Sequence, residues 1–254
     1  MGAGHVADLV VPGPSPVHRL PAQCKLAATF LFVVAVVATP REAFWAFAAH
    51  AAVVVAAAAV GRLPLGVLAR RLVIEVPFLL FALALPLVGG GERTEVLGVP
   101  LSVAGLWGAW SILAKATLGL GATLVLTATT PLADVVTGLD RLRVPRVFTA
   151  VAGAMVRYAD VVAGDLRRMR IARESRGSDP RWLWQARAVA ATAGALFVRS
   201  YERGERVHLA MLSRGFDGTM PAVGGAAAAG ADWLAALLVP AAAAAVALAA
   251  AVAA

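Results

Sequence analysis

Full charges are scarce in this sequence: of its 254 residues only 15% are Asp, Glu, Lys or Arg, while 60% are apolar. A soluble domain normally carries a charge on about a quarter of its residues. The deficit, the long uncharged runs and a mean hydropathy of +0.79 exclude an ordinary cytosolic enzyme and a disordered chain, and they indicate a membrane protein. A single cysteine, Cys24, excludes an internal disulfide and with it a secreted disulfide scaffold.

Motifs of catalysis and metal binding are also missing. The sequence has no G-x-x-x-x-G-K-[ST] phosphate loop, so ATP hydrolysis is not expected of this chain. No Ser/His/Asp set, Cys/His set or intramembrane pair of acids is apparent. The histidines have no partner at a three- or four-residue spacing, as converging metal ligands would need; they are His5, His18, His50 and His208. We therefore expect no catalytic residue, no cofactor and no bound metal.

Five stretches approach the roughly 20 apolar residues that a spanning helix needs. They are Leu26 to Ala38, Ala43 to Val60, Leu72 to Val88, Leu101 to Thr130 and Trp233 to Ala254. The first is short, and the long stems of Lys25 and Arg41 beside it are expected to reach the lipid headgroups. Pro240 is expected to kink the last helix rather than end it. The first 24 residues lack the pattern of a cleavable signal, so we expect the first apolar stretch to be retained.

Charge divides the chain into regions. Residues 131–220 hold 15 Lys/Arg and 9 Asp/Glu, whereas the whole remainder of the chain holds only 8 and 6. We expect a Pro/Gly-rich, solvated lead-in over 1–24, a four-helix membrane region over 25–130, a basic helical insert over 131–220, and a hinge with a last spanning helix over 221–254. Most loop arginines and lysines fall on the side of the amino terminus and the insert if the helices alternate. By the positive-inside rule that side is cytoplasmic.

The basic insert holds two long amphipathic patterns. After Pro145, apolar residues recur at three- and four-residue steps between arginines, and a second helical pattern runs from about Leu183 to Leu212. Neither is apolar enough to span, so both are expected at the cytoplasmic membrane surface. Nine interspersed acids and the lack of aromatics on the basic face argue against nucleic acid. Arg167, Arg168 and Arg170 suit anionic lipid of the inner leaflet.

Both patterns end in the same repeated octapeptide, A-x-x-S-R-G-x-D. The shared residues are Ala172, Ser175, Arg176, Gly177 and Asp179 in one copy and Ala210, Ser213, Arg214, Gly215 and Asp217 in the other. Each Gly is expected to take the left-handed conformation that ends a helix. Each Arg then lies in the last turn, where the helix dipole favours a cation and its planar group can grip a carboxylate, and the small Ala permits close approach of another backbone.

Two interpretations of the repeat compete. A single Arg-Gly pair is commonly only a cap that complements the helix dipole. Two copies that share five residues in the same order favour a repeated partner instead. The simplest such partner is a two-fold symmetric protein with an acidic groove in each half.

Two ionisable residues lie inside apolar stretches, where charge is by default a functional candidate. Glu75 follows Arg71 by four residues, so we favour an interfacial helical pair over a functional role. Lys115 lies nearer the middle of its stretch. It either pairs with a carboxylate or a helix end across the bundle, or faces a water-filled surface used by a partner; the sequence does not choose between these interpretations.

The chain resembles the transmembrane T component of energy-coupling-factor transporters, a branch of the ATP-binding-cassette importers, over nearly its whole length. Beside the two octapeptides, the resemblance rests on Ser15-Pro-Val-His-Arg-Leu20 with Lys25-Leu26, on Thr129-Thr130-Pro131 and on the stretch from Leu139 to Pro145. The run Ser-Arg-Gly-Phe-Asp-Gly at 213–218 is most like the cobalt-type members.

The apolar stretches and the basic insert predict an all-α integral membrane protein of about five transmembrane helices plus a cytoplasmic coupling domain of amphipathic helices, in the cell membrane. The resemblance implies that the helices ending in Arg176 and Arg214 are coupling helices, each docking into a groove of one of two ATPase subunits and pairing with acids there. It also implies that a separate membrane S component captures the substrate, and that this chain has no nucleotide or substrate site of its own.

Other functions stay open from the sequence. Cobalt as cargo is implied by likeness only, and nickel or a vitamin such as biotin fits the same physical arguments. An integral membrane lipid or isoprenoid transferase is a rival that predicts an acid cluster at the cytoplasmic ends of the spans, which this sequence does not show. A membrane anchor that binds lipid without energy coupling is a second rival, and copurification with ATPase subunits distinguishes it.

Overall fold

The computed structural model describes residues 10–90, 92–96, 99–177, 186–218 and 228–253. The chain divides into two compact units. Leu9–Gly138 together with Gly225–Ala254 forms the membrane body, and Leu139–Gly224 forms what we call the α8–α9 unit. Asp179, His5 and most of the expected hinge over 222–231 lie outside the described residues.

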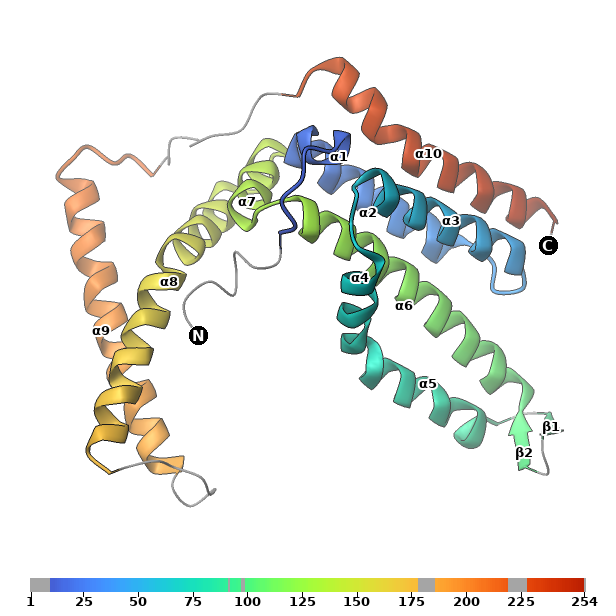
Figure 1. Cartoon of the computed structure of the whole chain (residues 1–254), viewed down its shortest axis with the longest axis horizontal. Helices are drawn as coiled ribbons and strands as arrows, with labels where there is room; N and C mark the ends of the chain where they lie inside the picture. The colour runs from blue at the N-terminus through green and yellow to red at the C-terminus, as the bar shows by residue number, and fades with distance from the viewer. Residues whose placement is uncertain (1–9, 91, 97–98, 178–185, 219–227, 254) are drawn as a thin grey trace. The chain divides into compact units, whose positions relative to one another are not determined.

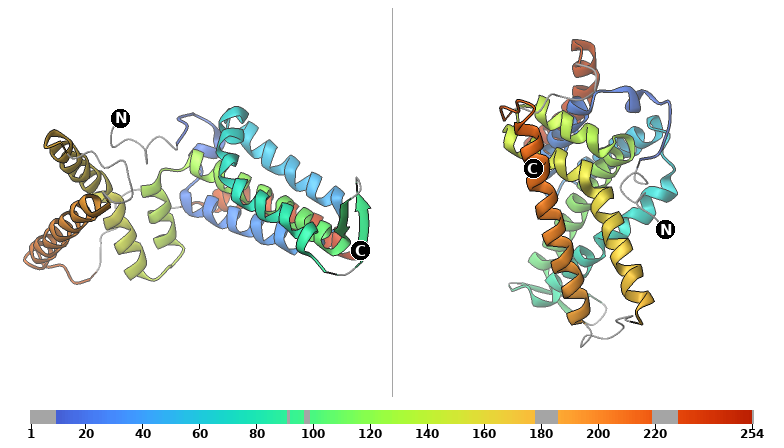
Figure 2. Two further views of the ribbon diagram at one scale, coloured as in Figure 1. Left: turned by 90° about the horizontal axis from the view of Figure 1, so that it is seen from below. Right: turned by 90° about the vertical axis from the view of Figure 1, so that its left-hand side faces the viewer.

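The membrane body is built of helices, as expected. In chain order it contains α1 (Pro16–Arg19), α2 (Ala22–Ala38), α3 (Phe44–Val60), α4 (Leu65–Arg71), the 3-10 helix η2 (Leu72–Glu75), α5 (Val76–Val88), α6 (Val103–Thr129), most of α7 (Leu132–Arg141) and, after the other unit, α10 (Gly230–Ala253). Helix α2 packs against α6 and α10, α3 packs against the same two helices, and α5 packs against α6 (Figures 1 and 2).

The described residues include four helical stretches long and apolar enough to cross a membrane. They are Ala69–Val88, Val103–Thr129, Arg146–Ser175 and Gly230–Ala253, while α2 and α3 are apolar but shorter. The prediction that the helix after Pro145 is too polar to span is therefore wrong by length and composition, because its first half is apolar and its charges crowd into the second half. Helix α10 continues through Pro240, as predicted.

Side chains from four helices fill the largest core of the membrane body. Phe32, Ala35 and Val36 of α2 meet Phe47 of α3, Leu118 of α6 and Ala243 of α10. Alanines and valines let the backbones approach closely, which is how helices associate where lipid removes the usual hydrophobic driving force. The alanine-rich α10 therefore has a packed face as well as a lipid-facing one.

The stretch predicted over Leu72 to Val88 is not one regular helix. Residues Leu72–Glu75 form a 3-10 turn, and α5 begins at Val76 with Pro77 in its first turn. Proline has no N–H to donate and its ring clashes with the carbonyl four residues earlier, so the preceding turn tightens. The start of the next predicted stretch, Leu101, instead belongs to a short antiparallel hairpin of β1 (Arg93–Val96) and β2 (Val99–Ser102), which the sequence did not indicate.

A glycine sets the contact between α5 and α6. A Cβ placed on Gly105 would lie 2.5 Å from the carbonyl oxygen of Leu85 and 2.8 Å from the Cα of Pro86. Ser102, the N-cap of α6, accepts a hydrogen bond from the Gly105 N–H and donates another to the Gly90 carbonyl. The start of α6 is thereby held tightly against the end of α5.

The α8–α9 unit consists of two long helices. Helix α8 spans Arg146–Ser175 with Pro145 at its N-cap, and α9 spans Ala186–Leu212. They contact and cross each other (Figure 1). The predicted break at Pro145 is confirmed, and within the described residues so is the second helical pattern ending at Leu212.

Candidate functional site

The first octapeptide ends α8 as predicted. Gly177 has a φ of +77°, in the left-handed region, and its N–H donates to the carbonyl of Glu174 at 3.0 Å. The N–H of Arg176 donates to the carbonyl of Arg173 at 3.1 Å. These bonds satisfy carbonyls that the end of a helix leaves without partners.

The second octapeptide repeats that geometry at the end of α9. Gly215 has a φ of +81°, and its N–H donates to the Leu212 carbonyl at 3.0 Å. The N–H of Phe216 reaches back to the Met211 carbonyl, also at 3.0 Å. This pair of bonds is the Schellman ending, in which a left-handed glycine turns the chain away from the helix.

The shared serine and alanine interact in both copies. Ser175 donates its hydroxyl to the Ala172 carbonyl at 3.0 Å, and Ser213 donates to the Ala210 carbonyl at the same distance. The sequence indicated only that the alanine is small, not that its carbonyl is an acceptor. Four of the five repeated residues thus take part in one local structure, made twice.

Both tips present their arginines to the surroundings. All eight residues predicted for the tips are exposed: Ala172, Ser175, Arg176, Gly177, Ala210, Ser213, Arg214 and Gly215. Among the residues that the structure describes, the side chains of Arg176 and Arg214 have no hydrogen-bond or ion-pair partner. A purely structural arginine would be expected to fold back on its own helix end, so this exposure leaves both guanidinium groups available to a partner.

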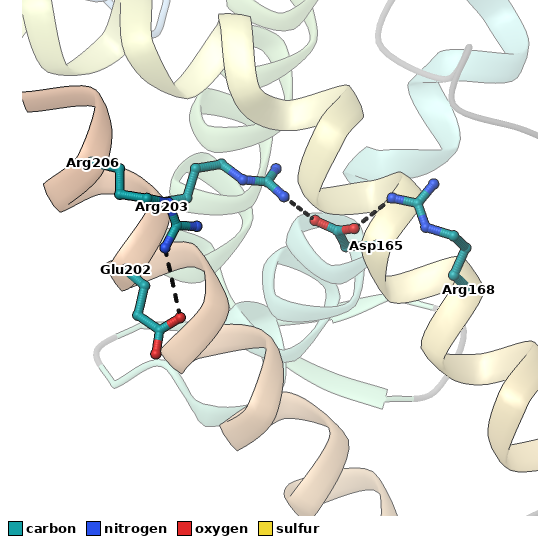
Figure 3. A network of polar contacts seen from close by, with 5 residues as sticks. All are labelled: Asp165, Arg168, Glu202, Arg203 and Arg206. Atoms are coloured by element: carbon teal, nitrogen blue, oxygen red, sulfur yellow. Dashed lines mark hydrogen bonds and ion pairs between the residues drawn. The ribbon is translucent and has the colours of Figure 1, made fainter. Parts of the chain in front are cut away.

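An ion-pair network joins α8 and α9 at a distance from the tips (Figure 3). The carboxylate of Asp165 on α8 accepts from Arg203 of α9 at 2.9 Å and from Arg168 of its own helix. A second cross-helix bond runs from Arg173 to the Thr192 hydroxyl at 3.3 Å. No sequence pattern had marked Asp165 or Arg203, because the pairing depends on how α8 and α9 cross.

Glu75 has a partner that the sequence did not indicate. Its carboxylate accepts a hydrogen bond from the Thr117 hydroxyl of α6 at 2.7 Å. The bond ties the turn before α5 to the middle of α6. The predicted pair with Arg71 stays a prediction, and a structural role for Glu75 already follows from the Thr117 bond.

Lys115 binds a helix end, one of the two interpretations left open for it. Its ammonium group donates to the carbonyl of Val37 in the last turn of α2, at 2.7 Å. Such carbonyls lack a partner within their own helix and carry the negative end of the helix dipole, so they suit a cation. Nearby, in the loop between α2 and α3, a hydrogen bond from Arg41 lowers the pKa of the exposed Glu42 carboxyl.

Lys25 corrects a prediction. The residue is only 8% exposed, and its ammonium group donates to the carbonyl of Thr129, the last residue of α6, at 2.9 Å. It therefore does not reach for the headgroups. The contact ties the start of α2 to the end of α6, and so joins two of the segments on which the family resemblance rests, Lys25-Leu26 and Thr129-Thr130-Pro131.

The described part of the lead-in is packed rather than solvated. His18 bonds the Ser15 hydroxyl through Nδ1 at 2.6 Å and the Val11 carbonyl through Nε2 at 2.8 Å. Ser15 is 1% exposed, and the N–H of Val11 donates to the Ala128 carbonyl of α6. The serine and histidine of the Ser15 to Leu20 segment therefore fix the lead-in on the end of α6.

The histidines do not gather. His50 is fully buried and its Nε2 lies 3.0 Å from the Thr39 hydroxyl, while His18 belongs to the lead-in. In the described ranges, no three His, Cys, Asp or Glu side chains come together in a way that could hold a metal ion.

Comparison with known proteins identifies the family. The profile of the family described as CbiQ, cobalt transport protein, matches residues 13–223. The chain is 28% identical over 222 residues to the energy-coupling factor transporter transmembrane protein EcfT of Bacillus selenitireducens, covering 82% of each chain. It is 28% identical over 162 residues to the cobalt transport protein CbiQ of Rhodobacter capsulatus, covering 63% of this chain and 64% of that one.

A third relative is longer. It is a Methanocorpusculum labreanum protein provisionally named as the fused cobalt transport protein CbiMQ. The two sequences are 28% identical over 145 residues, which cover 55% of this chain and 24% of that protein. The chain thus spans about a quarter of that relative and less than two thirds of the Rhodobacter one. The match of the family profile extends over both arginine tips and most of the membrane body. The chain belongs to the CbiQ family of cobalt transport proteins.

Proposed function

We propose that this protein is the membrane T component of an energy-coupling-factor importer, which passes the movement of two ATPase subunits to a substrate-binding S component. The observation that carries the proposal is the presence of two exposed arginine tips, Arg176 and Arg214. Both tips have the same serine-to-alanine hydrogen bond and the same left-handed glycine. The names of the relatives support the transporter class, and cobalt is the cargo we propose because the family and two relatives are named for it.

In this proposal each tip binds one ATPase subunit. The planar guanidinium group makes two hydrogen bonds to a carboxylate, and the glycine that follows lets the chain turn away without filling the groove. Among the described residues, no atom lies within 4 Å of a Cβ placed on Gly177 or Gly215, so the described part of the chain leaves the space around each tip open.

The proposed orientation places the amino terminus and both arginine tips on the cytoplasmic side. The second half of α8 carries charges that would be costly in lipid, among them Arg167, Arg168, Arg170 and Arg173. The asymmetry of the loop arginines points the same way. The ATPase subunits and their ATP are cytoplasmic, so this orientation brings the tips to them.

The S component needs a contact surface on this chain. Val147, Val151 and Met155 stand at four-residue steps on the apolar first half of α8, and they are 72%, 55% and 68% exposed. We propose that this stripe faces the S component. Movement of the tips would then reach the membrane partner through α8 itself.

Copurification tests the docking role. The double variant Arg176→Glu and Arg214→Glu is expected to reduce recovery of the ATPase pair more than tenfold, because each substitution removes a charge-assisted pair and places like charges together. Arg157→Glu with Arg199→Glu is the matched control, since both arginines are exposed on the same two helices away from the tips. Undiminished recovery of the ATPase subunits with the tip variant would refute the proposal.

A vitamin importer of the same class is the alternative for the cargo, because the tips would serve any S component. Uptake of radioactive cobalt by cells that express the whole transporter distinguishes the two. Uptake of a vitamin such as biotin without uptake of cobalt would favour the alternative while leaving the T component role intact.

A further inference from the structure

One ion pair joins two residues that lie equally far along the chain from their arginine tips. Asp165 lies about three helical turns before Arg176, and Arg203 lies the same number of residues before Arg214. That length of helix spans about 16 Å. Arg203 Nη2 donates to Asp165 Oδ2 at 2.9 Å, so the bond joins positions 38 residues apart, which is also the offset between the two octapeptides (Figure 3).

The two helices run in opposite directions past this contact. Arg173, about two turns after Asp165, bonds Thr192, which lies about three turns before Arg203. Moving forward along α8 therefore means moving backward along α9. The two tips lie on opposite sides of the ion pair.

In two copies related by a two-fold axis, equivalent positions can touch only near that axis, as in an isologous contact. Asp165 and Arg203 are equivalent in the register of the repeat, and they touch. This contact, together with the opposite directions of the two helices, is what a local two-fold axis midway between the tips would produce. A pair of ATPase subunits with two-fold symmetry would share that axis.

We propose that the Asp165–Arg203 ion pair is the pivot of the two helices, a positioning pair for energy coupling. It holds the crossing point, so that displacement of the tips changes the angle between α8 and α9 instead of sliding one helix along the other. This inference rests on the proposed function, because it takes the tips as the docking points of a two-part motor.

The chemistry of the network suits a pivot. The Asp165 side chain is 14% exposed and both of its oxygens accept hydrogen bonds, one from Arg203 and one from Arg168. Carboxylate oxygens accept over a broad range of directions, so the bond can persist while the helices rotate. By contrast, the pair of Glu202 and Arg206 is longer, at 3.9 Å, more exposed and confined to α9.

The repeat offers a specific test, because Arg206 follows position 203 by three residues, as Arg168 follows Asp165. Exchanging the charges, Asp165→Arg with Arg203→Asp, would rebuild the same three-membered network with the carboxylate on α9. Asp165→Arg alone would instead set three arginines against one another. Asp165→Asn removes the charge with almost no change of shape.

Spin labels at Ile171 and Leu209, which are exposed and equivalent in the repeat, report the geometry of the pair. The buried Cys24 is replaced by Ala, and the full-length chain is measured in nanodiscs with and without its ATPase subunits. We expect one narrow distance distribution in the parent chain, a broad one in Asp165→Arg and Asp165→Asn, and a narrow one again in the exchanged variant. Glu202→Gln, which alters a pair within one helix, should leave the distribution unchanged.

Coupling is read from cobalt uptake and ATP hydrolysis by the assembled transporter. Asp165→Arg should lower uptake about tenfold while hydrolysis continues, within the range typical of coupling between sites. The exchanged variant should recover most of the uptake. A loss of uptake that the exchange does not reverse, or a distribution that stays narrow in both single variants, overturns the pivot.

Failure of the proposed function would look different. The ATPase subunits would then be absent from the parent complex, in which Arg176, Arg214 and Asp165 are all intact. The distances in the isolated chain would still show whether the ion pair fixes the crossing of α8 and α9.

Discussion

The ammonium group of Lys115, inside α6, donates a hydrogen bond to the carbonyl of Val37 in the last turn of α2. Lys25, at the start of α2, does the same to the carbonyl of Thr129 at the end of α6. Each helix thus supplies a lysine to the end of the other. The two lysines link α2 and α6 at two levels, and in both cases the cation meets the negative end of a helix dipole.

Replacing Lys115 by Met is expected to lower the free energy of unfolding of the purified chain by about 1 kcal/mol, which is the usual contribution of one hydrogen bond between helices in a membrane. Lys115→Arg keeps a donor and should lose less. Thermal unfolding followed by circular dichroism in detergent measures both. Unchanged stability of Lys115→Met with a loss of uptake would favour the other interpretation, in which Lys115 serves a partner.

Lys25→Met is expected to be more damaging than Lys115→Met, by about a further 1 kcal/mol, because Lys25 is buried and its loss leaves a buried carbonyl without a donor. The two variants are compared in one unfolding series. If Lys25→Met lowered the free energy of unfolding by no more than Lys115→Met does, burial of the Thr129 carbonyl would not be what makes the Lys25 hydrogen bond important.

Gly105 is expected to tolerate no side chain. Gly105→Ala would push a methyl group into the backbone of α5, at the Leu85 carbonyl, and should destabilise the chain by about 1 to 3 kcal/mol, as overpacking typically does. Gly119→Ala is the control, because Gly119 lies in the same helix and a Cβ there meets no atom of the described part of the chain within 4 Å; this variant should be neutral or stabilising. Similar unfolding temperatures for the two variants would show that α5 and α6 are not in close contact.

The tip glycines are expected to matter for their backbone conformation alone. No atom of the described residues lies within 4 Å of a Cβ placed on Gly177 or Gly215, so alanine there is expected to add strain of about 1 to 2 kcal/mol without a clash. We expect the double variant Gly177→Ala and Gly215→Ala to bind the ATPase pair about tenfold more weakly, as judged by copurification.

Gly194→Ala serves as the control for the tip glycines, because Gly194 lies inside α9 and a Cβ there meets nothing within 4 Å in the ranges that the structure describes. It should leave binding of the ATPase pair unchanged. Equal binding by the tip variant and this control would mean that the left-handed turn does not shape the docking surface.

The sequence predicted those features that depend on neighbours along the chain. The glycine endings at 177 and 215, the break at Pro145 and the passage of α10 through Pro240 each follow from one or two residues and their backbone preferences. Composition was sufficient for the membrane class, because long uncharged runs are typical of helices that cross a bilayer.

The missed features depend on contacts between distant residues. Nothing near Asp165 in the sequence indicates Arg203, and nothing near Lys25 indicates the Thr129 carbonyl 104 residues away. The prediction for Lys25 was wrong because a lysine that reaches the headgroups and a lysine that bonds the end of another helix have the same neighbours in the sequence. The apolar first half of α8 was misjudged because the arginines of its second half dominate the average.

Cross-linking from the two tips tests the central claim most directly. A photoreactive amino acid replaces Glu174 or Leu212, which are exposed, equivalent in the repeat and each two residues before a tip arginine. In the intact membrane complex we expect both positions to cross-link to ATPase subunits, one subunit from each tip. Cross-links from either position only to lipid or to this chain itself would contradict the account.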